Sequence, residues 1–453
     1  MTLINNRESL IKSAINDKNK RGREYILNIF QKAVMSVLPR NLIKGKLFIK
    51  DGILNICDYK KELKDISNIF LIGGGKATGG MAKAVLKRIP KRIQTGVINI
   101  PERIVKKIGD LKNIEIIGAG HPIPTKKGFD GTKKMLYLIE KAEKDDLIIC
   151  LISGGGSALM PYPFEGISLK DLQELTDLFL KAGLSIEEIN IIRKHCSRIK
   201  GGQLVRNNKA DFVSLIISDV LNDPLDMIAS GPTVPDKSTF EDVKQIIEKY
   251  ELREAIPTSI KNHLEQGYQG NIPDTPKKGD PIFKKVRNFI IGNLDLAVES
   301  GIKLAEEYEI HVKKISTSIT GEASEVGLKL LSKLKSANKP IMLIGGGETT
   351  VTVKGNGKGG RNQEIVLSAC RKINELGIII ASLGTDGIDG NSDAAGAIAD
   401  YSVIKKIEEK GLSINEFLKE NDSYSLFKKI NDGAIFTGYT GTNVNDIHVL
   451  LSI

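Results

Sequence analysis

Apolar runs alternate with amphipathic segments along most of this chain. Residues 5–40 have helical periodicity, which ends at Pro39. Beyond a turn at Gly52, short apolar runs typical of strands occupy residues 68–72, 95–100, 114–120, 146–152 and 211–218. Helical spacing separates these runs at residues 77–89, 128–144 and 169–200. Apolar strands that alternate with helices predict an α/β fold with a mainly parallel sheet covered on both faces.

A polar segment divides this pattern into two parts. Residues 267–281 concentrate Gly, Pro and charged residues without apolar periodicity. Strand-like runs then restart at 288–292, 311–317 and 340–344. Residues 349–354 (TTVTVK) alternate at a period of two, which predicts a half-exposed strand. We therefore expect two α/β domains, residues 1–275 with a mainly parallel sheet and a smaller domain with a mixed sheet at residues 276–453.

The charge of the chain is strongly positive, with 66 Lys and Arg against 55 Asp and Glu among 453 residues. Such a balance can mark a nucleic-acid binding surface. Only 14 of the cations are Arg, however, and the lysines are scattered rather than clustered. Aromatic residues make up 5% and Trp is absent, which leaves few platforms for stacking bases. A solvated lysine-rich surface, with no nucleic-acid partner, is the better interpretation.

The sequence gives no sign of membrane insertion or secretion. No apolar stretch approaches the ~18 residues of a membrane span, and the charged N-terminus lacks the apolar centre of a secretory signal. We expect a soluble cytoplasmic protein that does not bind membranes. The four cysteines form no CxxC pair, which disfavours a zinc site or a disulfide framework.

Three segments share one form: an apolar run, three glycines, then small or polar residues. They are residues 71–77 (LIGGGKA), 151–158 (LISGGGSA) and 343–349 (LIGGGET). Glycine at the carboxyl end of a strand lets the backbone approach a ligand closely, and a following helix presents N–H groups to an anion. Tight strand-to-helix turns also use glycine for structural reasons alone. A P-loop motif is absent, and the dinucleotide fingerprint is incomplete because Thr78 takes its last position.

Two polar clusters directly follow buried strands. SDVLNDPLDMIASGPT (218–233) puts Asp219 and Asp223 on a strand-end loop, where carboxylates can hold Mg²⁺ or accept a proton. Turn and helix-capping chemistry is the alternative for both residues. The second cluster, LGTDGIDGNSDAAGA (383–397), contributes three further aspartates, Asp386, Asp389 and Asp393.

Three basic side chains lie at or beside these loops. KGNGKGGRNQE (354–364) opens into a helix with Arg361 in its first turn, where a cation opposes the helix dipole and suggests a bound anion. Lys76 follows the first triple-glycine turn and could reach a phosphate or carboxylate, or be a solvated lysine at a helix start. His121 precedes Pro122 and could bind substrate or be a hydrogen-bonded loop histidine.

Taken together, these motifs resemble the glycerate 2-kinase family, with its characteristic C-terminal MOFRL-type domain. The motifs that carry the resemblance are GGGKATGGMAKA, GAGHPIPT, LISGGGSALM, SRIKGGQL, SDVLNDPLDMIASGPT, GNLDLA, TGEA, GGGETTV, GKGGRNQE, LGTDGIDGNSDAAGA and TGTNVND. The resemblance implies a Rossmann-like N-terminal domain, a smaller C-terminal α/β domain and an active site in the cleft between them. It also implies transfer of the ATP γ-phosphate to the 2-hydroxyl of D-glycerate, giving 2-phosphoglycerate and ADP, with Mg²⁺ or another divalent cation.

The resemblance also carries site residues over to this chain. Lys76, Arg361 and Asp219 are the expected catalytic residues, and Asp219 with Asp223 are the expected metal ligands. The residues expected to bind substrate or nucleotide are Gly74, Gly75, His121, Ser153, Gly154, Gly155, Gly156, Ser157, Lys200, Asn222, Gly346, Glu348, Thr349, Gly360, Asn362, Gln363, Thr385, Asp386 and Asp389. The family's usual GHP-x-P-D reads GHPIPT here, so Thr125 replaces the aspartate.

Alternatives from other functional classes stay open at this point. One is an NAD(P)H-dependent hydroxypyruvate reductase, which the incomplete dinucleotide fingerprint disfavours. Another is a noncatalytic sugar-acid or nucleotide sensor built on the same fold. Among kinases, the 3-hydroxyl of glycerate competes as the acceptor. The expected partners are D-glycerate and ATP, and a homodimer stays open.

Overall fold

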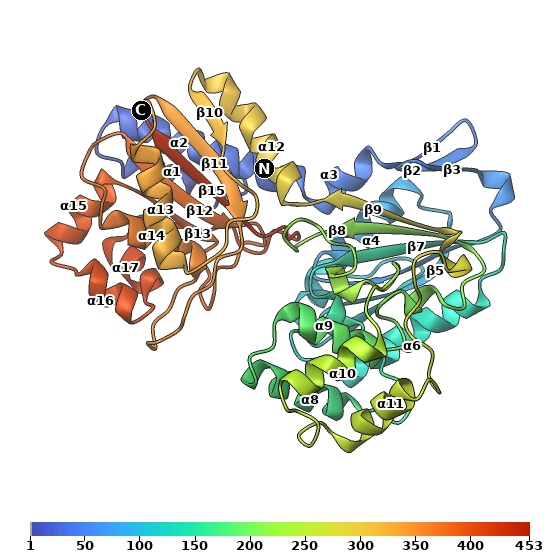
Figure 1. The fold of residues 1–453 in the computed structure, drawn as a ribbon. Coiled ribbons are helices and arrows are strands. Elements are labelled where there is room, and N and C mark those ends of the chain that lie inside the picture. Colours follow the sequence, from blue (N-terminus) through green and yellow to red (C-terminus); the bar gives the residue numbers. More distant parts are fainter. Residues whose placement is uncertain (1) are drawn as a thin grey trace. The chain divides into compact units, whose positions relative to one another are not determined.

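The computed structural model describes residues 2–453, which form two compact units (Figure 1). The middle unit is Leu42–Ile291, and the terminal unit combines the chain up to Asn41 with Gly292–Ile453. Each unit is an α/β structure built on its own six-stranded sheet. The prediction of two α/β parts with different sheets is therefore confirmed.

The middle unit has a sheet in the order β6-β5-β4-β7-β8-β9, and its pairs from β6 to β8 are parallel. The strands are β4 (Ile69–Gly74), β5 (Ile93–Pro101), β6 (Ile114–Ala119), β7 (Leu147–Ser153), β8 (Asp211–Ile217) and β9 (Val286–Gly292). An antiparallel sheet of β1 (Leu47–Lys50), β2 (Ile53–Ile56) and β3 (Tyr59–Glu62) precedes them. The central strands β4 and β7 are buried at every position, which accounts for their unbroken apolar runs.

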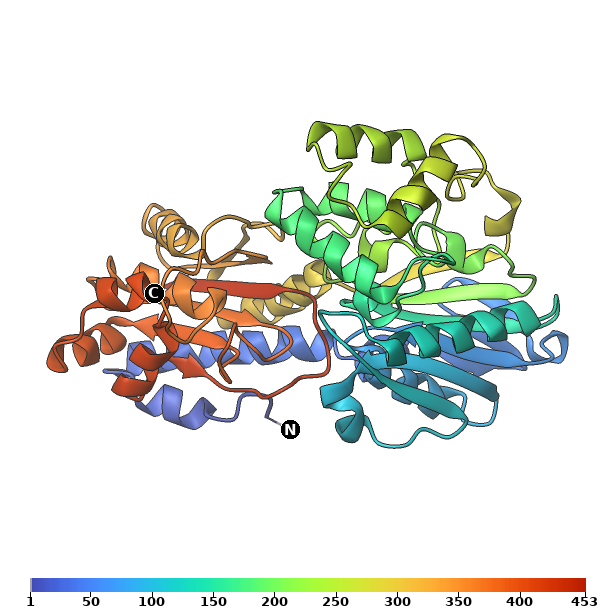
Figure 2. The same ribbon diagram turned by 90° about the horizontal axis from the view of Figure 1, so that it is seen from below.

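Helices surround this sheet and add a second apolar core. They are α4 (Thr78–Arg88), α5 (Val105–Ile108), α6 (Lys126–Lys141), α7 (Gly156–Leu159), α8 (Leu169–Lys181), α9 (Ile186–His195), α10 (Phe240–Lys249) and α11 (Thr258–Tyr268), with α3 (Pro39–Lys44) at the start of the unit. Figure 2 shows α8 to α11 gathered as one group beside the sheet, and they share their own buried apolar cluster. Reciprocal capping boxes at Ser168 and Ser185 fix where α8 and α9 begin.

The terminal unit has a mixed sheet in the order β10-β11-β15-β12-β13-β14, in which the β10–β11 pair is parallel and the other four pairs are antiparallel. The strands are β10 (His311–Lys314), β11 (Ile341–Gly347), β12 (Ile378–Gly384), β13 (Gly396–Asp400), β14 (Ala434–Ile435) and β15 (Asp446–Ser452). The helices are α1 (Arg7–Lys12), α2 (Asp17–Ser36), α12 (Leu294–Ala305), α13 (Ala323–Lys335), α14 (Arg361–Cys370), α15 (Tyr401–Glu409), α16 (Ile414–Lys419) and α17 (Ser423–Ile430).

The N-terminal helices belong to the terminal unit rather than to the part that follows them in sequence. Helix α2 packs on the terminal sheet so closely that a Cβ at Gly22 would lie 2.3 Å from Cδ1 of Ile379. The buried guanidinium of Arg23 donates hydrogen bonds of 2.7 and 2.9 Å to Asp400 and one of 3.0 Å to Asp432. The expected domain 1–275 therefore differs from the compact units at its N-terminal end, because the partner of this amphipathic helix lies far along the chain.

The second boundary differs as well. Residues 288–292, predicted as the first strand of the domain 276–453, lie in β9 and complete the sheet of the middle unit. Most of the polar segment 267–281 is therefore a loop within the middle unit, which follows the end of α11 at Tyr268 and precedes β9. Local composition marks a loop of this kind as strongly as a linker, so sequence pattern does not distinguish the two.

The predicted strand at residues 349–354 is wrong. Only an isolated bridge at Thr350 is present, and the following backbone has no regular structure. Side chains take the place of a neighbouring strand, since the N–H of Thr352 donates to Glu322 at 3.0 Å and that of Lys354 to Asn421 at 2.7 Å. Of the two valines in this segment, Val351 is half-buried and Val353 is 74% exposed, so the alternation does not mark a buried sheet face.

None of the helices formed by residues 2–453 is both long enough and apolar enough to cross a membrane.

Candidate active site

The turns that follow β4, β7 and β8 lie next to one another at the carboxyl edge of the parallel sheet. Strand registers bring this about, because Gly74 pairs with Ile152 and Ser153 pairs with Ile217. Ligands in open α/β sheets bind at this edge. The sequence motifs that end these strands are therefore neighbours in space.

Hydrogen bonds lock the first two turns together. The backbone N–H of Lys76 donates to the carbonyl of Gly154 at 2.9 Å, and that of Ala77 donates to Oγ of Ser153 at 3.0 Å. Gly75 has a φ of +150°, and a Cβ there would lie 2.1 Å from Oγ of Ser153. Glycine is required at this position because any side chain would separate the two turns. The start of the Lys76 side chain is thereby held rigidly.

Gly155 lies beside the side chains of His121 and Lys76. Its φ is +80°, and a Cβ on it would lie 2.7 Å from Cδ2 of His121 and 3.5 Å from Cε of Lys76. Burial, with the positive charges of Lys76 and Arg103, lowers the pKa of His121 to about 4. His121 is therefore a neutral imidazole at physiological pH, able to exchange hydrogen bonds with a polar ligand.

Asp219 reaches the same edge from the loop after β8. A Cβ at Gly154 would lie only 1.7 Å from its Oδ2, so the carboxylate packs directly against the second glycine turn. Asn222 and Asp223 lie further along this loop, with φ of +63° and +55°. The structure thus brings Asp219 beside the glycine turns, and none of Asp219, Asn222 and Asp223 lines the cavity described next.

A cavity of about 380 Å³ opens beside these turns. The residues that line it are His121, Pro122, Ile123, Pro124, Gly155, Ser157, Ala158, Pro161, Tyr162, Leu172, Gln173, Thr176, Asp177, Arg193, Ser197 and Lys200. Four of them, His121, Gly155, Ser157 and Lys200, are site residues expected from the sequence. We call this space the main cavity.

Two cations of the main cavity, Lys200 and Arg193, lack an acidic partner. Nζ of the buried Lys200 donates to the carbonyl of Ser157 at 2.7 Å and to its Oγ at 2.8 Å. The Arg193 guanidinium donates to Oγ1 of Thr176 at 3.2 Å. Neither cation forms an ion pair with any of residues 2–453. Burial lowers the pKa of both groups, that of Lys200 to about 7 with a smaller contribution from Arg193.

Sequence reasoning missed Arg193, together with Asp177 on α8. Both lie on amphipathic helices whose pattern indicates only packing, and no motif surrounds them. Their placement depends on how α8 and α9 pack against the loops of the sheet. The only sequence signal at Arg193 is the scarcity of arginine in this chain.

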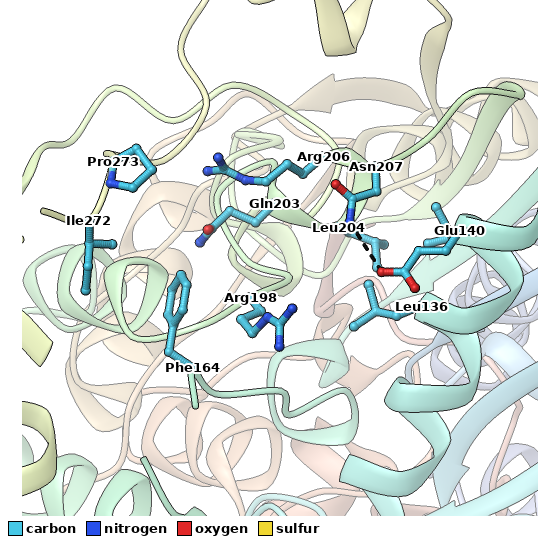
Figure 3. Close-up of a pocket in the computed structure, with 11 residues that line it drawn as sticks. Leu136, Glu140, Phe164, Arg198, Gln203, Leu204, Arg206, Asn207, Ile272 and Pro273 are labelled. Carbon is cyan, nitrogen blue, oxygen red and sulfur yellow. Dashed lines mark hydrogen bonds between the residues drawn. The ribbon is translucent and has the colours of Figure 1, made fainter. Parts of the chain in front are cut away.

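A smaller cavity of about 200 Å³ lies elsewhere in the middle unit (Figure 3). Leu136, Phe164, Leu204 and Ile272 contribute apolar surface, and Asn207 donates a hydrogen bond to Glu140 at 3.3 Å. None of the site residues expected from the sequence lines it. The main cavity is therefore the stronger candidate for an active site.

In the terminal unit, Arg361 is the first residue of α14 as predicted, and two carboxylates hold it. Its Nη1 donates to Glu348 at 2.8 Å, and its Nε lies 2.6 Å from Oδ2 of the buried Asp446. Burial alone would lower the pKa of Arg361, but the charges of Asp446 and Glu348 outweigh it, so the pKa is raised. Asp446 was missed in the sequence, although it ends the TGTNVND motif.

Asp389, expected to bind ligand, caps the start of α14. Its two carboxylate oxygens accept the backbone N–H groups of Asn362 at 3.0 Å and Gln363 at 2.9 Å. The side-chain amides of Asn362 and Gln363 also donate to it, at 3.2 and 2.9 Å. Gly360 leaves room for this cap, since a Cβ there would lie 2.4 Å from Asp389. These four motif positions thus build the helix start that presents Arg361.

The remaining expected residues of the terminal unit lie around the ends of β11 and β12. Gly346 packs against the backbone of Asp446, where a Cβ would lie 2.2 Å from the carbonyl oxygen. Thr385 donates to the carbonyl of Asn445 at 2.7 Å, and Asp386 follows it in sequence. Thr349 is buried, and its Oγ1 has no hydrogen-bond partner within residues 2–453.

The donor set at the carboxyl edge fits a hard divalent cation only in part. No group of three or more His, Cys, Asp or Glu within residues 2–453 is arranged to hold a metal ion. Mg²⁺ usually binds through one or two carboxylates plus substrate phosphates and water. The carboxylate of Asp219, beside the glycine turns, has the chemistry for one such ligand.

Comparison with known proteins gives two family matches. Residues 25–265 match a domain of unknown function, DUF4147, and residues 341–446 match the MOFRL family. The chain is 40% identical to the glycerate 2-kinase of Pyrococcus horikoshii over 95% of this chain and 97% of the relative. It is 38% identical to the D-glycerate 2-kinase of Thermotoga maritima over 95% and 98% of the two chains.

Solved structures agree with these matches. The crystal structure of glycerate kinase from Thermotoga maritima has a TM-score of 0.83 at 38% identity and covers 98% of this chain and 100% of its own. A structure from Pyrococcus horikoshii has a TM-score of 0.81 at 40% identity, with 95% and 98% coverage. Sequence and structure together show that this chain belongs to the glycerate 2-kinase family, composed of DUF4147 and MOFRL domains.

Proposed function

We propose that the chain transfers the γ-phosphate of ATP to the 2-hydroxyl of D-glycerate, giving 2-phosphoglycerate and ADP. The observation that carries this proposal is the main cavity, in which the guanidinium of Arg193 forms no ion pair within residues 2–453. A buried cation without a counter-charge is costly, and an anionic ligand removes that cost. The carboxylate of glycerate is such a ligand. The relatives described above are named for glycerate phosphorylation, which supports the same substrate.

The side chains of the cavity suit a small hydroxy acid. Arg193 can form a charge-assisted pair with the carboxylate. His121, neutral because its pKa is lowered to about 4, can hydrogen-bond a substrate hydroxyl. The cavity of about 380 Å³ leaves space for the hydroxyl group beside Ser157 and Lys200. The main cavity therefore has a place for each polar group of glycerate.

Lys76 and Arg361 are the proposed charge-neutralising residues. Phosphoryl transfer depends mostly on positioning and on stabilising the charge of the transferring group. The backbone of Lys76 is fixed by its bond to Gly154, and Arg361 is oriented by Glu348 and Asp446. The backbone of Lys76 and the guanidinium of Arg361 are thus preorganised, and preorganised charge is what this kind of catalysis requires.

A divalent cation is part of the proposal. Asp219 would hold it, with Asp223 as the second candidate ligand from the same loop. Bound there, Mg²⁺ would neutralise charge on the nucleotide phosphates. A cytoplasmic location and a homodimer also stay proposals for this chain.

Coupled assays distinguish this proposal from its alternatives. D-Glycerate, ATP and Mg²⁺ are supplied, and the product is passed to enolase with and without phosphoglycerate mutase. We expect a signal with enolase alone, which requires the 2-phosphate. A signal that needs the mutase would show attack by the 3-hydroxyl. Absence of ADP formation would contradict the kinase proposal, and NADPH oxidation with hydroxypyruvate would then identify a reductase.

A further inference from the structure

We propose that Lys200 accepts the proton of the attacking substrate hydroxyl, an inference that rests on the proposed function and adds a catalytic residue to it. The starting point is the position of Lys200 in the main cavity. Its side chain is 6% exposed and extends to Ser157, which lines the same cavity. The Lys200 side chain therefore lies in the cavity wall, and most of it is shielded from bulk water.

A directed chain of hydrogen bonds determines what this amine can do. The hydroxyl of Ser230 donates to Oδ1 of Asn190 at 3.1 Å, so its only proton is used. The hydroxyls of Ser157 and Ser230 lie 3.1 Å apart, and Ser157 must be the donor of that bond. Oγ of Ser157 is then left to accept a proton from Nζ of Lys200, at 2.8 Å.

The hydrogen bonds that Nζ of Lys200 donates leave one of its positions for a ligand. Two of its N–H bonds go to the carbonyl and the Oγ of Ser157, at 2.7 and 2.8 Å. One tetrahedral position is left for a ligand in the cavity. In the ammonium form that position is a third N–H, and in the neutral amine it is a lone pair. The neutral form is thus an acceptor with a fixed orientation.

The surroundings favour the neutral form. Burial and the nearby charge of Arg193 both act against the ammonium and lower the pKa of Lys200 to about 7. The other charged or titratable groups on the elements around it are His121 and Asp177 in the cavity wall, and Asp236 behind Gly201. Asp236 accepts a hydrogen bond from Nζ of Lys194 at 3.0 Å. None of these carboxylates forms an ion pair with Lys200 within the described chain.

The proposed step balances as follows. The substrate O–H bond breaks and its proton moves to the lone pair of Nζ, while the oxygen forms a bond to the γ-phosphorus of ATP. The bond between that phosphorus and the bridging oxygen breaks, and the electron pair leaves with ADP. The ammonium releases its proton to water once the product has left. General-base assistance of this kind contributes about 10²–10⁴-fold to turnover.

The test compares the wild type with Lys200→Arg, Lys200→Met and the control Lys209→Met. Lys209 is an exposed lysine of the same segment, held only by Glu143 at 3.2 Å. We expect kcat of both Lys200 variants to fall by about 10²–10⁴-fold. The wild-type kcat should decline below pH 7, and this acid limb should be absent from the residual activity of Lys200→Arg. Wild-type turnover and pH profile in either Lys200 variant would overturn the proposal.

A stability measurement reports on the proton site without using activity. Because the folded-state pKa of Lys200 lies below that of the unfolded chain, the unfolded chain binds more protons between pH 7 and about 10. The wild-type Tm should therefore rise relative to that of Lys200→Met as pH increases from 7 to 9. A constant difference would show that Lys200 stays charged and would overturn the proposal. Loss of this trend is distinct from failure of the kinase proposal, which would appear as no ADP from the wild type.

Discussion

Buried and half-buried cations of the two units differ in what neutralises them. In the terminal unit, Arg23 is paired with Asp400 and Asp432, and Arg361 is paired with Glu348 and Asp446. In the main cavity of the middle unit, Arg193 and Lys200 donate only to uncharged oxygens. A paired cation is complete within the fold, whereas an unpaired one gains a counter-charge when an anion binds. The comparison thus separates cations that hold structure from cations available to substrate.

The largest expected effect tests the structural side of this comparison. Arg23→Met removes the guanidinium that pairs with the buried carboxylates of Asp400 and Asp432, of which Asp432 keeps Lys406 at 2.7 Å, and should destabilise the protein by about 3–5 kcal/mol. Arg7→Met, in which the lost partners are the more exposed Glu8 and Glu24, should cost about 1 kcal/mol or less. Thermal or urea unfolding measures both. Equal losses in the two variants would contradict the assignment of Arg23 as a structural cation.

Arg361 is the strongest test of this comparison, because it is paired with two carboxylates and is also a proposed catalytic residue. Arg361→Ala should lower kcat/KM by about 10²–10³-fold, the loss typical of a preorganised charge-stabilising group. Arg371→Ala, at the other end of α14, should keep the wild-type value. Steady-state kinetics below the Tm of each variant provides the measurement. If Arg361→Ala loses only stability, Arg361 belongs with Arg23 as a structural cation.

A smaller effect is expected from two glycines that share a backbone conformation. Gly155 and Gly166 have φ of +80° and +87°, so alanine strains both by about 1–2 kcal/mol. Only at Gly155 would the new Cβ meet His121, whereas Gly166 has open space around it. Gly155→Ala should therefore also lower kcat/KM, by about 10-fold or more, because it displaces a cavity side chain. Comparable activity in the two variants would remove Gly155 and His121 from the site.

Local patterns in the sequence predicted the parallel sheet and the glycine turns well. Strand β7 is a buried apolar run that ends at Ser153, and such runs are recognisable without knowledge of their neighbours. Glycine is required at Gly75 and Gly154 because Ser153 and Asp219 of the neighbouring turns approach these positions closely. The triple-glycine motifs indicated both positions in the sequence. The identification of the family followed from these same motifs.

Features that depend on distant partners were not predictable in this way. Helix α2 joins the terminal unit through Gly22 and Arg23, whose partners lie more than 350 residues away. Arg193 faces the main cavity because of how α9 packs, and nothing in its local sequence shows that. The capping role of Asp389 was not predictable, because capping and ligand binding both use an aspartate in a glycine-rich loop.

Direct binding of D-glycerate tests the central claim, that the unpaired guanidinium of Arg193 in the main cavity holds the substrate carboxylate. Isothermal titration would compare the wild type with Arg193→Met and with Arg206→Met, an exposed arginine of the smaller cavity. Loss of a charge-assisted hydrogen bond costs about 1.5–3 kcal/mol. The Kd of Arg193→Met should therefore rise by about 10–100-fold, while that of Arg206→Met stays at the wild-type value. Unchanged affinity in Arg193→Met would contradict the claim.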